Sequence, residues 1–320
     1  MKPPCHEGAR PARRRLDGVL LLDKALGQSS NQALQAARRL YAAAKAGHTG
    51  TLDPLATGLL PLCFGEATKF SGELLNADKR YVATVQLGVT TDTADAEGAV
   101  LQRRPVELGR PVVEAALVAF VGQIEQVPPM YSALKRDGKP LYEYARAGIE
   151  VERAARRVSI HALRLVGADD GLDGGRFVVE VHCSKGTYVR TLAAVIGERL
   201  GCGAHLAALH RTGIGALDVA QAHSLSMLEG LAGSARDALL SPADSLLFSL
   251  AEARLDFAEA TRLRQGQAVR WFGEEGSRLR VYDANHSFIG VCRQLADGWL
   301  QPLRLVAGAP AENLRISCPA

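Results

Sequence analysis

Residues 47–58 carry the side chains with the clearest chemical potential. The segment reads GHTGTLDPLATG, and its one carboxylate, Asp53, stands among small and apolar residues. An aspartate with an ordinary pKa of ~3.9 is ionised at neutral pH, so it can act as a nucleophile or charge stabiliser without an activating base. An Asp-Pro step is also common in turns, where the carboxylate bonds nearby backbone N–H groups. Taken alone, the segment leaves both interpretations open.

Other kinds of chemistry find little support. The sequence contains neither a GxxxxGK[ST] loop nor a GxGxxG turn after a strand, so it predicts no nucleotide cofactor. Cys202 and His205 have a zinc-like separation, but no second pair accompanies them, and we predict no metal site. A hydrolase triad of Ser184, His48 and Asp53 is conceivable, yet the chain has no GxSxG elbow.

The segment 47–58 resembles the catalytic loop of the bacterial TruB-type tRNA pseudouridine synthases, including the spacing of His48, Asp53 and the closing glycine. The resemblance covers about residues 16 to 310. Further segments that carry it are residues 18–24, 65–69, 78–81, 131–135, 141–146 and 184–191. Ala25 departs from the pattern, because the family usually has proline there, so we expect a less rigid turn after Lys24.

The resemblance implies an enzyme that isomerises uridine 55 in the T loop of tRNA to pseudouridine, without any cofactor. Asp53 would be the nucleophile on a flipped-out uridine, with attack at C1′ or C6 left open. Arg190 would pair with Asp53 and favour its charged form. Tyr81 would stack on the uracil and either remove the C5 proton or hold the detached base, while Tyr188 would line the pocket floor.

The resemblance also implies contacts to the T arm of tRNA. His48 would occupy the space near the flipped nucleotide. Five cations would meet phosphates and make binding sensitive to salt. These are Lys24, Lys69, Lys135, Lys139 and Arg146. A non-catalytic RNA-binding or RNA-folding protein on the same scaffold is the alternative, and an intact set of Asp53, Tyr81 and Arg190 argues against it.

The elements that must position these residues follow from the hydrophobic pattern. An apolar run predicts a strand over residues 18–24, and helical periodicity predicts a helix over 31–46, capped by Ser29 or Ser30. Residues 47–58 are expected to form an irregular loop. Alternation predicts a strand over 80–90. The remaining predictions are helices over 112–120 and 187–200 and a hairpin of 157–166 with 176–184.

We therefore predict an α+β protein. Its catalytic domain, residues 16–250, would have a mixed, largely antiparallel sheet and an RNA-gripping insertion at about 123–156. A small β-rich domain similar to a PUA domain would span 251–312. A basic N-terminal arm, 1–15, and a tail, 313–320, would flank these domains.

Composition is consistent with this assignment. The 320 residues carry a net charge of +4, which permits an anionic partner such as RNA without requiring one. The six cysteines lack a disulfide-type spacing, and no apolar run is long enough to span a bilayer. We expect a cytoplasmic monomer with no membrane contact.

Overall fold

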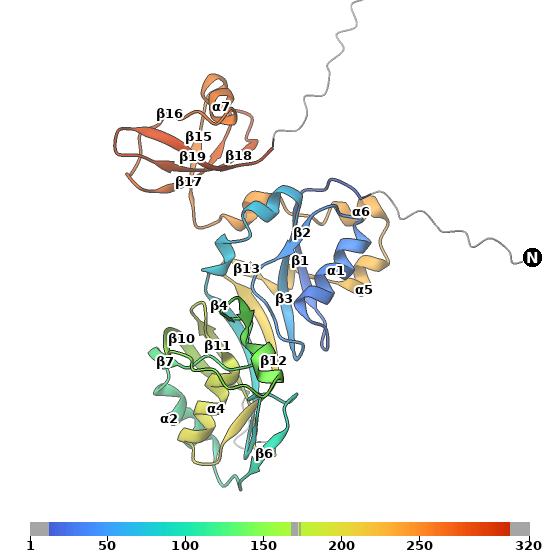
Figure 1. Cartoon of the computed structure of the whole chain (residues 1–320), viewed down its shortest axis with the longest axis vertical. Coiled ribbons are helices and arrows are strands. Elements are labelled where there is room, and N and C mark those ends of the chain that lie inside the picture. The colour runs from blue at the N-terminus through green and yellow to red at the C-terminus, as the bar shows by residue number, and fades with distance from the viewer. Residues whose placement is uncertain (1–12, 168–171, 173, 308–320) are drawn as a thin grey trace, which may run out of the picture.

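The computed structural model describes residues 13–167, 172 and 174–307. The predicted tail and most of the predicted N-terminal arm lie outside these residues. Figure 1 shows an elongated molecule, with a larger part below and a small C-terminal unit at the top of the view. None of the helices in the described ranges combines the length and the apolar character that crossing a bilayer requires.

A ten-stranded sheet runs through the larger part. In spatial order, its main path is β14 (His223–Ser224), β1 (Gly18–Lys24), β3 (Ala56–Phe64), β12 (Ala204–Ile214), β4 (Lys79–Leu87), β11 (Arg176–Cys183), β10 (Arg156–Val166) and β7 (Gly122–Gln126). Off this path, β13 (Leu217–Asp218) pairs with β12, and β2 (Ala46–His48) pairs with β3. The β1–β14 and β3–β12 pairs are parallel and the others antiparallel, which confirms the predicted mixed, largely antiparallel sheet.

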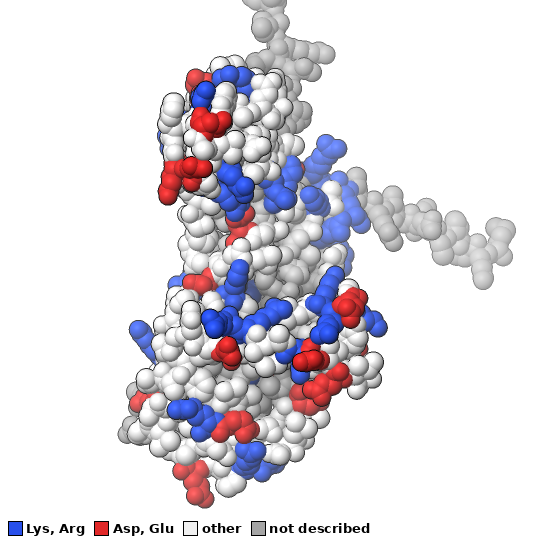
Figure 2. All heavy atoms as spheres, turned by 60° about the vertical axis from the view of Figure 1, so that its left-hand side comes forward, with Lys and Arg blue, Asp and Glu red and all other residues white. Residues whose placement is uncertain are grey.

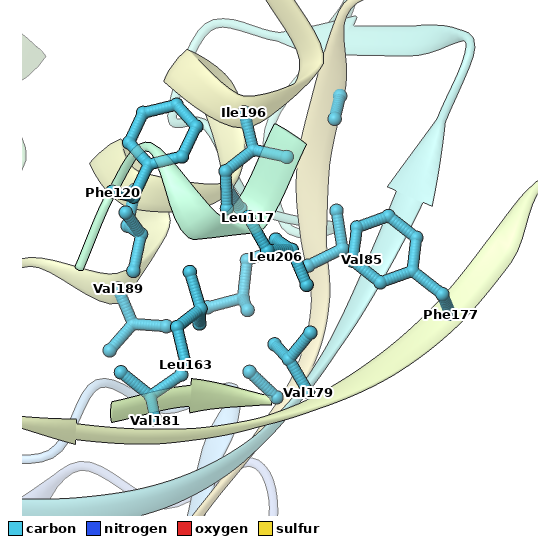
Figure 3. Close-up of a cluster of buried hydrophobic side chains, with 14 of the residues drawn as sticks. Val85, Leu117, Phe120, Leu163, Phe177, Val179, Val181, Val189, Ile196 and Leu206 are labelled. Atoms are coloured by element: carbon cyan, nitrogen blue, oxygen red, sulfur yellow. The ribbon is translucent and has the colours of Figure 1, made fainter. Parts of the chain in front are cut away.

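Helices α2 (Arg110–Val118) and α4 (Val189–Arg199) pack on one half of this sheet. Each helix buries one apolar face there, because residues four positions apart lie on the same side of a helix. These residues are Val113 and Leu117 of α2, and Leu192 and Ile196 of α4. They meet alternate residues of the strands, such as Val85 on β4. Figure 3 shows this cluster from inside, with Val179 and Val181 of β11 directed toward the helices.

The other half of the sheet is buried on both faces. Leu20 and Leu22 of β1 point into one cluster, and Val19 and Leu21 point into another. Because successive strand residues face opposite sides, this double burial explains the continuous apolar run of β1. Helix α1 (Ser30–Leu40) covers the first cluster. The pieces α5 (Leu225–Glu229), α6 (Gly233–Asp237), η3 (Val219–Gln221) and η4 (Ala243–Leu246) complete this half.

Two predictions at this end of the molecule are wrong in part. Helix α1 begins as predicted, with a capping box between Ser29 and Gln32, but it ends at Leu40 instead of residue 46. Ala42 takes a positive φ of 49°, which stops the helix, and the chain then forms β2 against β3. For the same reason the segment 47–58 is not a loop throughout. Its first residues belong to β2 and its last to β3.

The predicted insertion, residues 123–156, is more ordered than a loop. It contains most of β7, a small hairpin of β8 (Lys135–Arg136) and β9 (Lys139–Pro140), and the short helix α3 (Leu141–Arg146). A second small hairpin, β5 (Val89–Thr91) with β6 (Val100–Arg103), follows β4. The predicted hairpin of β10 and β11 is confirmed, although part of its turn lies outside the described residues.

The C-terminal unit has its own five-stranded sheet and its own core. Its elements are β15 (Ala251–Arg254), α7 (Phe257–Arg264), β16 (Val269–Arg270), β17 (Arg278–Tyr282), β18 (Phe288–Gln294) and β19 (Trp299–Leu305). The sheet order is β15-β17-β18-β19-β16. A small β-rich C-terminal domain is therefore confirmed.

The C-terminal unit contacts the larger part through the 3-10 helices η1 (Gly65–Lys69) and η2 (Glu73–Leu75) and their neighbours. The rings of Phe70 and Phe288 lie 5.4 Å apart between centroids, edge to face. Arg278 donates two hydrogen bonds to Glu73, at 2.6 and 3.0 Å. The Tyr282 hydroxyl, in turn, lies 2.6 Å from a carboxylate oxygen of Asp244. These contacts fix how the two parts sit together.

Candidate active site

Asp53 lies in a loop that is tied down on both sides. The hydroxyl of Ser30, in the first turn of α1, accepts from the Leu52 N–H at 2.8 Å and donates to the Leu52 carbonyl at 3.0 Å. The Gly27 N–H donates to the Pro54 carbonyl at 2.9 Å. The Asp53 carboxylate is held between these anchored neighbours, and 43% of its side chain is exposed.

Arg190 is the partner of Asp53. Its Nε lies 3.0 Å from Asp53 Oδ2, and its Nη1 lies 3.3 Å from Asp95 Oδ2. The guanidinium also donates to the carbonyl oxygens of Tyr131, at 2.7 Å, and Thr93, at 3.3 Å. The Arg190 side chain is 6% exposed, and each of its three nitrogens has at least one acceptor from the protein.

Asp95 is a site residue that sequence reasoning missed. It is buried, and its second oxygen, Oδ1, accepts from the Thr93 hydroxyl at 2.6 Å and from the Glu97 N–H at 3.1 Å. These bonds aim Oδ2 at Arg190. An aspartate in the polar stretch between β5 and β6 reads as a surface turn, so no local signal distinguishes it. The fold alone brings it under α4.

Opposing influences act on the Asp53 carboxylate. Burial raises its pKa above the ordinary value, and the nearby charge of Asp95 raises it further. Arg190 and Lys24 oppose this rise, because their positive charges favour the ionised form. Arg190 thus gives the carboxylate both its orientation and a counter-charge.

Tyr81 lies on β4 and packs against both hydrophobic clusters that flank the site. Its hydroxyl is hydrogen-bonded with the guanidinium of Arg211, a second residue that sequence reasoning missed. Arg211 is 1% exposed and also donates to the carbonyl oxygens of Leu59 and Gly50, both at 2.8 Å. Burial raises the pKa of Tyr81, so its phenol is neutral at neutral pH.

Gly58 allows Arg211 to reach this position. The backbone of Gly58 has a φ of 96°, and a Cβ there would lie 2.4 Å from the Arg211 carbonyl oxygen. β3 and β12 run parallel at this point, with Gly58 opposite Arg211. A larger residue would separate the strands and shift Arg211 away from Tyr81.

His48 and Tyr188 are both part-buried at the edges of the site. His48 is on β2, and burial followed by the charge of Arg211 lowers its pKa, so the ring is neutral. Tyr188 is the N-cap residue of α4. Its backbone N–H donates to the side-chain oxygen of Gln126 at 3.0 Å, and its carbonyl accepts from the Gln126 amide at 3.3 Å.

Lys24 was expected at the RNA phosphates, and this prediction is wrong. The side chain is 1% exposed, and its ammonium donates to the carbonyl oxygens of Ala25, at 2.9 Å, and Gln28, at 2.6 Å. The turn after β1 folds these carbonyls over the ammonium. Burial lowers its pKa to about 8, while the charge of Asp53 acts in the opposite direction. Lys24 is a buried cation next to the site.

The other predicted phosphate contacts lie in two places. Lys69 donates to Glu66 and to the Leu305 carbonyl, at 2.7 and 2.9 Å, so it belongs to the junction with the C-terminal unit. It lines a pocket of about 510 Å³ there, together with Arg293 and Arg304. Figure 2 shows basic side chains gathered at mid-height of the molecule and beneath the C-terminal unit.

The second place is the insertion. Lys135, Lys139 and Arg146 are all exposed on the β8–β9 hairpin and α3. Lys139 lies 5.5 Å from the ring centroid of Tyr144, and Arg146 lies 5.3 Å from that of Tyr142. These stacked cations keep their charges on the surface. The same insertion supplies the Tyr131 carbonyl to Arg190, so it contacts the site at its base.

The hydrolase alternative gains nothing from the geometry. The Ser184 hydroxyl accepts from the Ser159 N–H at 2.9 Å and donates to the Lys185 carbonyl at 3.4 Å. Within the described ranges no hydrogen bond joins Ser184 to His48, so the serine has no base.

Comparison with known proteins finds matching families over most of the chain. The family described as TruB family pseudouridylate synthase (N terminal domain) matches residues 38–189. The tRNA pseudouridylate synthase B C-terminal domain matches residues 190–248, and the family described as Pseudouridine synthase II TruB, C-terminal, matches residues 251–306.

Among curated relatives, a protein of Burkholderia mallei named tRNA pseudouridine synthase B is 59% identical over 304 residues, 93% of this chain and 96% of the relative. A protein of the same name from Chromobacterium violaceum is 55% identical over 301 residues, 93% and 97% of the two chains. Among solved structures, a Cbf5-Nop10-Gar1 complex contains a chain with a TM-score of 0.69 at 21% identity, covering 90% of this chain and 84% of that one. This structural likeness concerns the fold.

Proposed function

The chain belongs to the TruB family of pseudouridylate synthases, and on that premise we propose that it isomerises uridine to pseudouridine at position 55 in the T loop of tRNA. Asp53 is the nucleophile in this proposal. The observation that carries it is the geometry of one carboxylate, held through Oδ2 by the buried Arg190, with much of its side chain still exposed to an incoming nucleotide.

The reaction needs no redox partner and no external group. The bond between ribose C1′ and uracil N1 breaks, the base turns, and a bond forms between C1′ and C5, while C5 loses a proton and N1 gains one. An ionised Asp53 can displace uracil from C1′, with the electron pair of the C1′–N1 bond leaving on N1, or it can add to C6 of the ring; in both cases a carboxylate oxygen forms the new bond. Arg190 keeps the attacking group charged and directed.

Tyr81 holds the detached uracil in this proposal. Its ring provides a stacking surface, and its hydroxyl is already engaged by Arg211. Because burial raises the pKa of Tyr81, a phenolate base at C5 is disfavoured, and of its two predicted roles the holding of the base has the better support. Tyr188 lines the floor of the site, and the neutral His48 lies beside the flipped nucleotide.

The T arm is recognised mainly by shape and charge in this proposal. The target uridine is stacked in folded tRNA, and its extrusion costs a few kcal/mol. Phosphate contacts from Lys135, Lys139 and Arg146 on the insertion offset that cost, with Lys69 contributing at the domain junction. All of these side chains but Lys69, which is part-buried, are exposed.

The test is the substitution Asp53→Asn, which keeps the shape of the side chain and removes its charge. We expect it to abolish turnover while tRNA affinity stays within a few fold, since the nucleophile is lost and the binding surface is intact. Tritium release from C5-labelled tRNA measures turnover, and filter binding measures affinity. The variant Asp297→Asn, which makes the same change at an exposed site in the C-terminal unit, is the control.

Retained turnover in Asp53→Asn would refute the assignment of the nucleophile. A wild-type protein that binds tRNA without forming any pseudouridine would instead favour the non-catalytic alternative. Carbodiimide mapping of tRNA from cells with and without the protein locates the modified position. A signal at a position other than 55 would overturn the proposed target while leaving the chemistry in place.

A further inference from the structure

Three potential metal ligands converge on the part of the sheet formed by β4, β10 and β11. Asp78 immediately precedes β4, His161 is on β10, and His182 is on β11. One ligand atom from each of them lies within 4.8 Å of the other two. Asp78 Oδ2 and His161 Nε2 are 3.2 Å apart, and the two imidazole centroids are 4.8 Å apart.

A β-bulge creates this arrangement. Ile160 pairs with Cys183 and Ala162 pairs with His182, so His161 is an extra residue in β10. Such a bulge turns the additional side chain out of the regular alternation. Ile160 and Leu163 stay in the core, and His161 is exposed beside His182. The bulge thus brings two imidazoles to one face.

We propose that Asp78, His161 and His182 form a site for Zn²⁺, with water as the fourth ligand. Two imidazole nitrogens and one carboxylate are a donor set that zinc uses when it keeps an open position. Bonds of about 2.0–2.2 Å in a tetrahedron put ligand atoms roughly 3.4 Å apart. The Asp78 and His161 atoms are already near that separation, and a small rotation of the part-buried His182 ring and of the exposed His161 ring closes the rest.

The surroundings leave room for the ion and its water. Arg80 lies opposite His182 on β4, but its guanidinium is directed the other way, to Asp218 on β13 at 3.1 Å. The ammonium of Lys185 donates to Asn76 at 2.7 Å, so it has its own acceptor. His182 also lines a pocket of about 450 Å³. A solvent ligand can therefore reach the fourth position.

The site is on the reverse face of the sheet from Asp53. Val181, next to His182, packs in the core under α4, the helix that carries Arg190. Because neighbouring strand residues face opposite sides, His182 points away from the active site. Zinc bound there would link the β10–β11 hairpin to the turn before β4. It would brace the sheet and take no part in the isomerisation.

Zinc titration of the purified, chelator-treated protein tests the site. We expect the wild type to take up about one ion per chain in equilibrium dialysis against ZnCl₂. His161→Asn and His182→Asn should each weaken binding at least about ten-fold. His286→Asn makes the same change at another exposed histidine, one with a positive φ that asparagine tolerates, and it should bind zinc as the wild type does.

Thermal unfolding provides a second measurement. Zinc should raise the melting temperature of the wild type and of His286→Asn, and leave both other variants unchanged, because an ion that binds the folded state stabilises it by mass action. The alternative is a surface ion pair between a protonated His161 and Asp78. Absence of zinc uptake by the wild type, or equal uptake by all four proteins, would overturn the proposal.

Discussion

At the scale of single residues, the site is governed by three charged groups in a row. Asp53 is partly exposed, Arg190 is buried, and Asp95 is buried behind it. The outer carboxylate is free to react, while the inner one fixes the guanidinium. Burying a cation is costly unless it is paired, and Asp95 provides that pairing.

The charges on either side of Asp53 predict opposite changes in the pH dependence of activity. Arg190 lowers the pKa of Asp53, so Arg190→Gln should raise that pKa and move the acid limb of the rate profile to higher pH. Asp95 raises the pKa of Asp53, so Asp95→Asn should move the limb to lower pH. Both variants should lose about a hundred-fold in rate at the optimum, because the orientation of the carboxylate suffers.

Single-turnover tritium release across a pH series measures both effects. A shift of the acid limb along the pH axis indicates an electrostatic role of Arg190 and Asp95, whereas a loss of rate alone would also result from a structural role. If the acid limb of the pH–rate profile moved in the same direction in both variants, the opposite effects of Arg190 and Asp95 on the pKa of Asp53 would be contradicted.

Part of the site could be predicted from the sequence. Asp53, Tyr81 and Arg190 lie in segments that carry a family resemblance, and the structure places Arg190 on Asp53. Asp95 and Arg211 could not be found, because their importance comes from contacts with residues far away in the chain. Lys24 was assigned to the wrong environment, since a lysine after an apolar strand gives no sign that carbonyls will enclose it.

At the scale of elements, the start of α4 sets the position of Arg190. Gln126, at the end of β7, binds both the N–H and the carbonyl of Tyr188 with its side-chain amide. These two hydrogen bonds connect the end of strand β7 to the first turn of helix α4. It joins the base of the insertion to the helix that carries the guanidinium.

Gln126→Leu should therefore impair catalysis without touching a charged group. The Tyr188 N–H loses its acceptor and the Tyr188 carbonyl keeps only the Leu192 N–H, so the first turn of α4 can shift. We expect kcat to fall about ten-fold with little change in KM, because the exposed RNA-binding side chains remain. Gln123→Leu, the same change at an exposed position of the same strand, is the control. Equal effects from both substitutions would count against a specific role of Gln126.

Regular elements could be predicted where the pattern is simple. β1 is a continuous apolar run because both of its faces are buried, and β11 alternates regularly between core and surface, whereas its partner β10 has a bulge at His161. The end of α1 could not be predicted, because Ala42, Ala43 and Ala44 after it are strong helix formers and extend the helical pattern. Pairing of β2 with β3 decides the outcome, and pairing depends on residues remote in sequence.

At the scale of the whole molecule, the two parts are held together by apolar and ionic contacts. Val291 of β18 is buried in a cluster with Phe70 and Leu74 of the larger part. Arg278 adds its double hydrogen bond to Glu73. The C-terminal unit should therefore follow the motion of the larger part instead of tumbling freely.

Phe288→Ala should uncouple the two parts. It removes the ring that contacts Phe70, at a cost of about 2–3 kcal/mol, below that of a fully buried phenylalanine because Phe288 is part-exposed. Scanning calorimetry should show the single transition of the wild type splitting into two. Phe272→Ala, at a ring that is 86% exposed, should leave the transition unchanged. One unsplit transition in Phe288→Ala would argue that the ionic contacts suffice.

The active site also lies at the boundary between two hydrophobic clusters, one under α1 and one under α4. Asp53 follows Leu52, which belongs to the cluster under α1, whereas Arg190 follows Val189, which belongs to the cluster under α4. Tyr81 packs against both. A slight parting of the two clusters on warming would lengthen the contact between nucleophile and guanidinium before any strand is lost. Heating should therefore abolish enzymatic activity at a temperature where the circular dichroism spectrum is still that of the native protein.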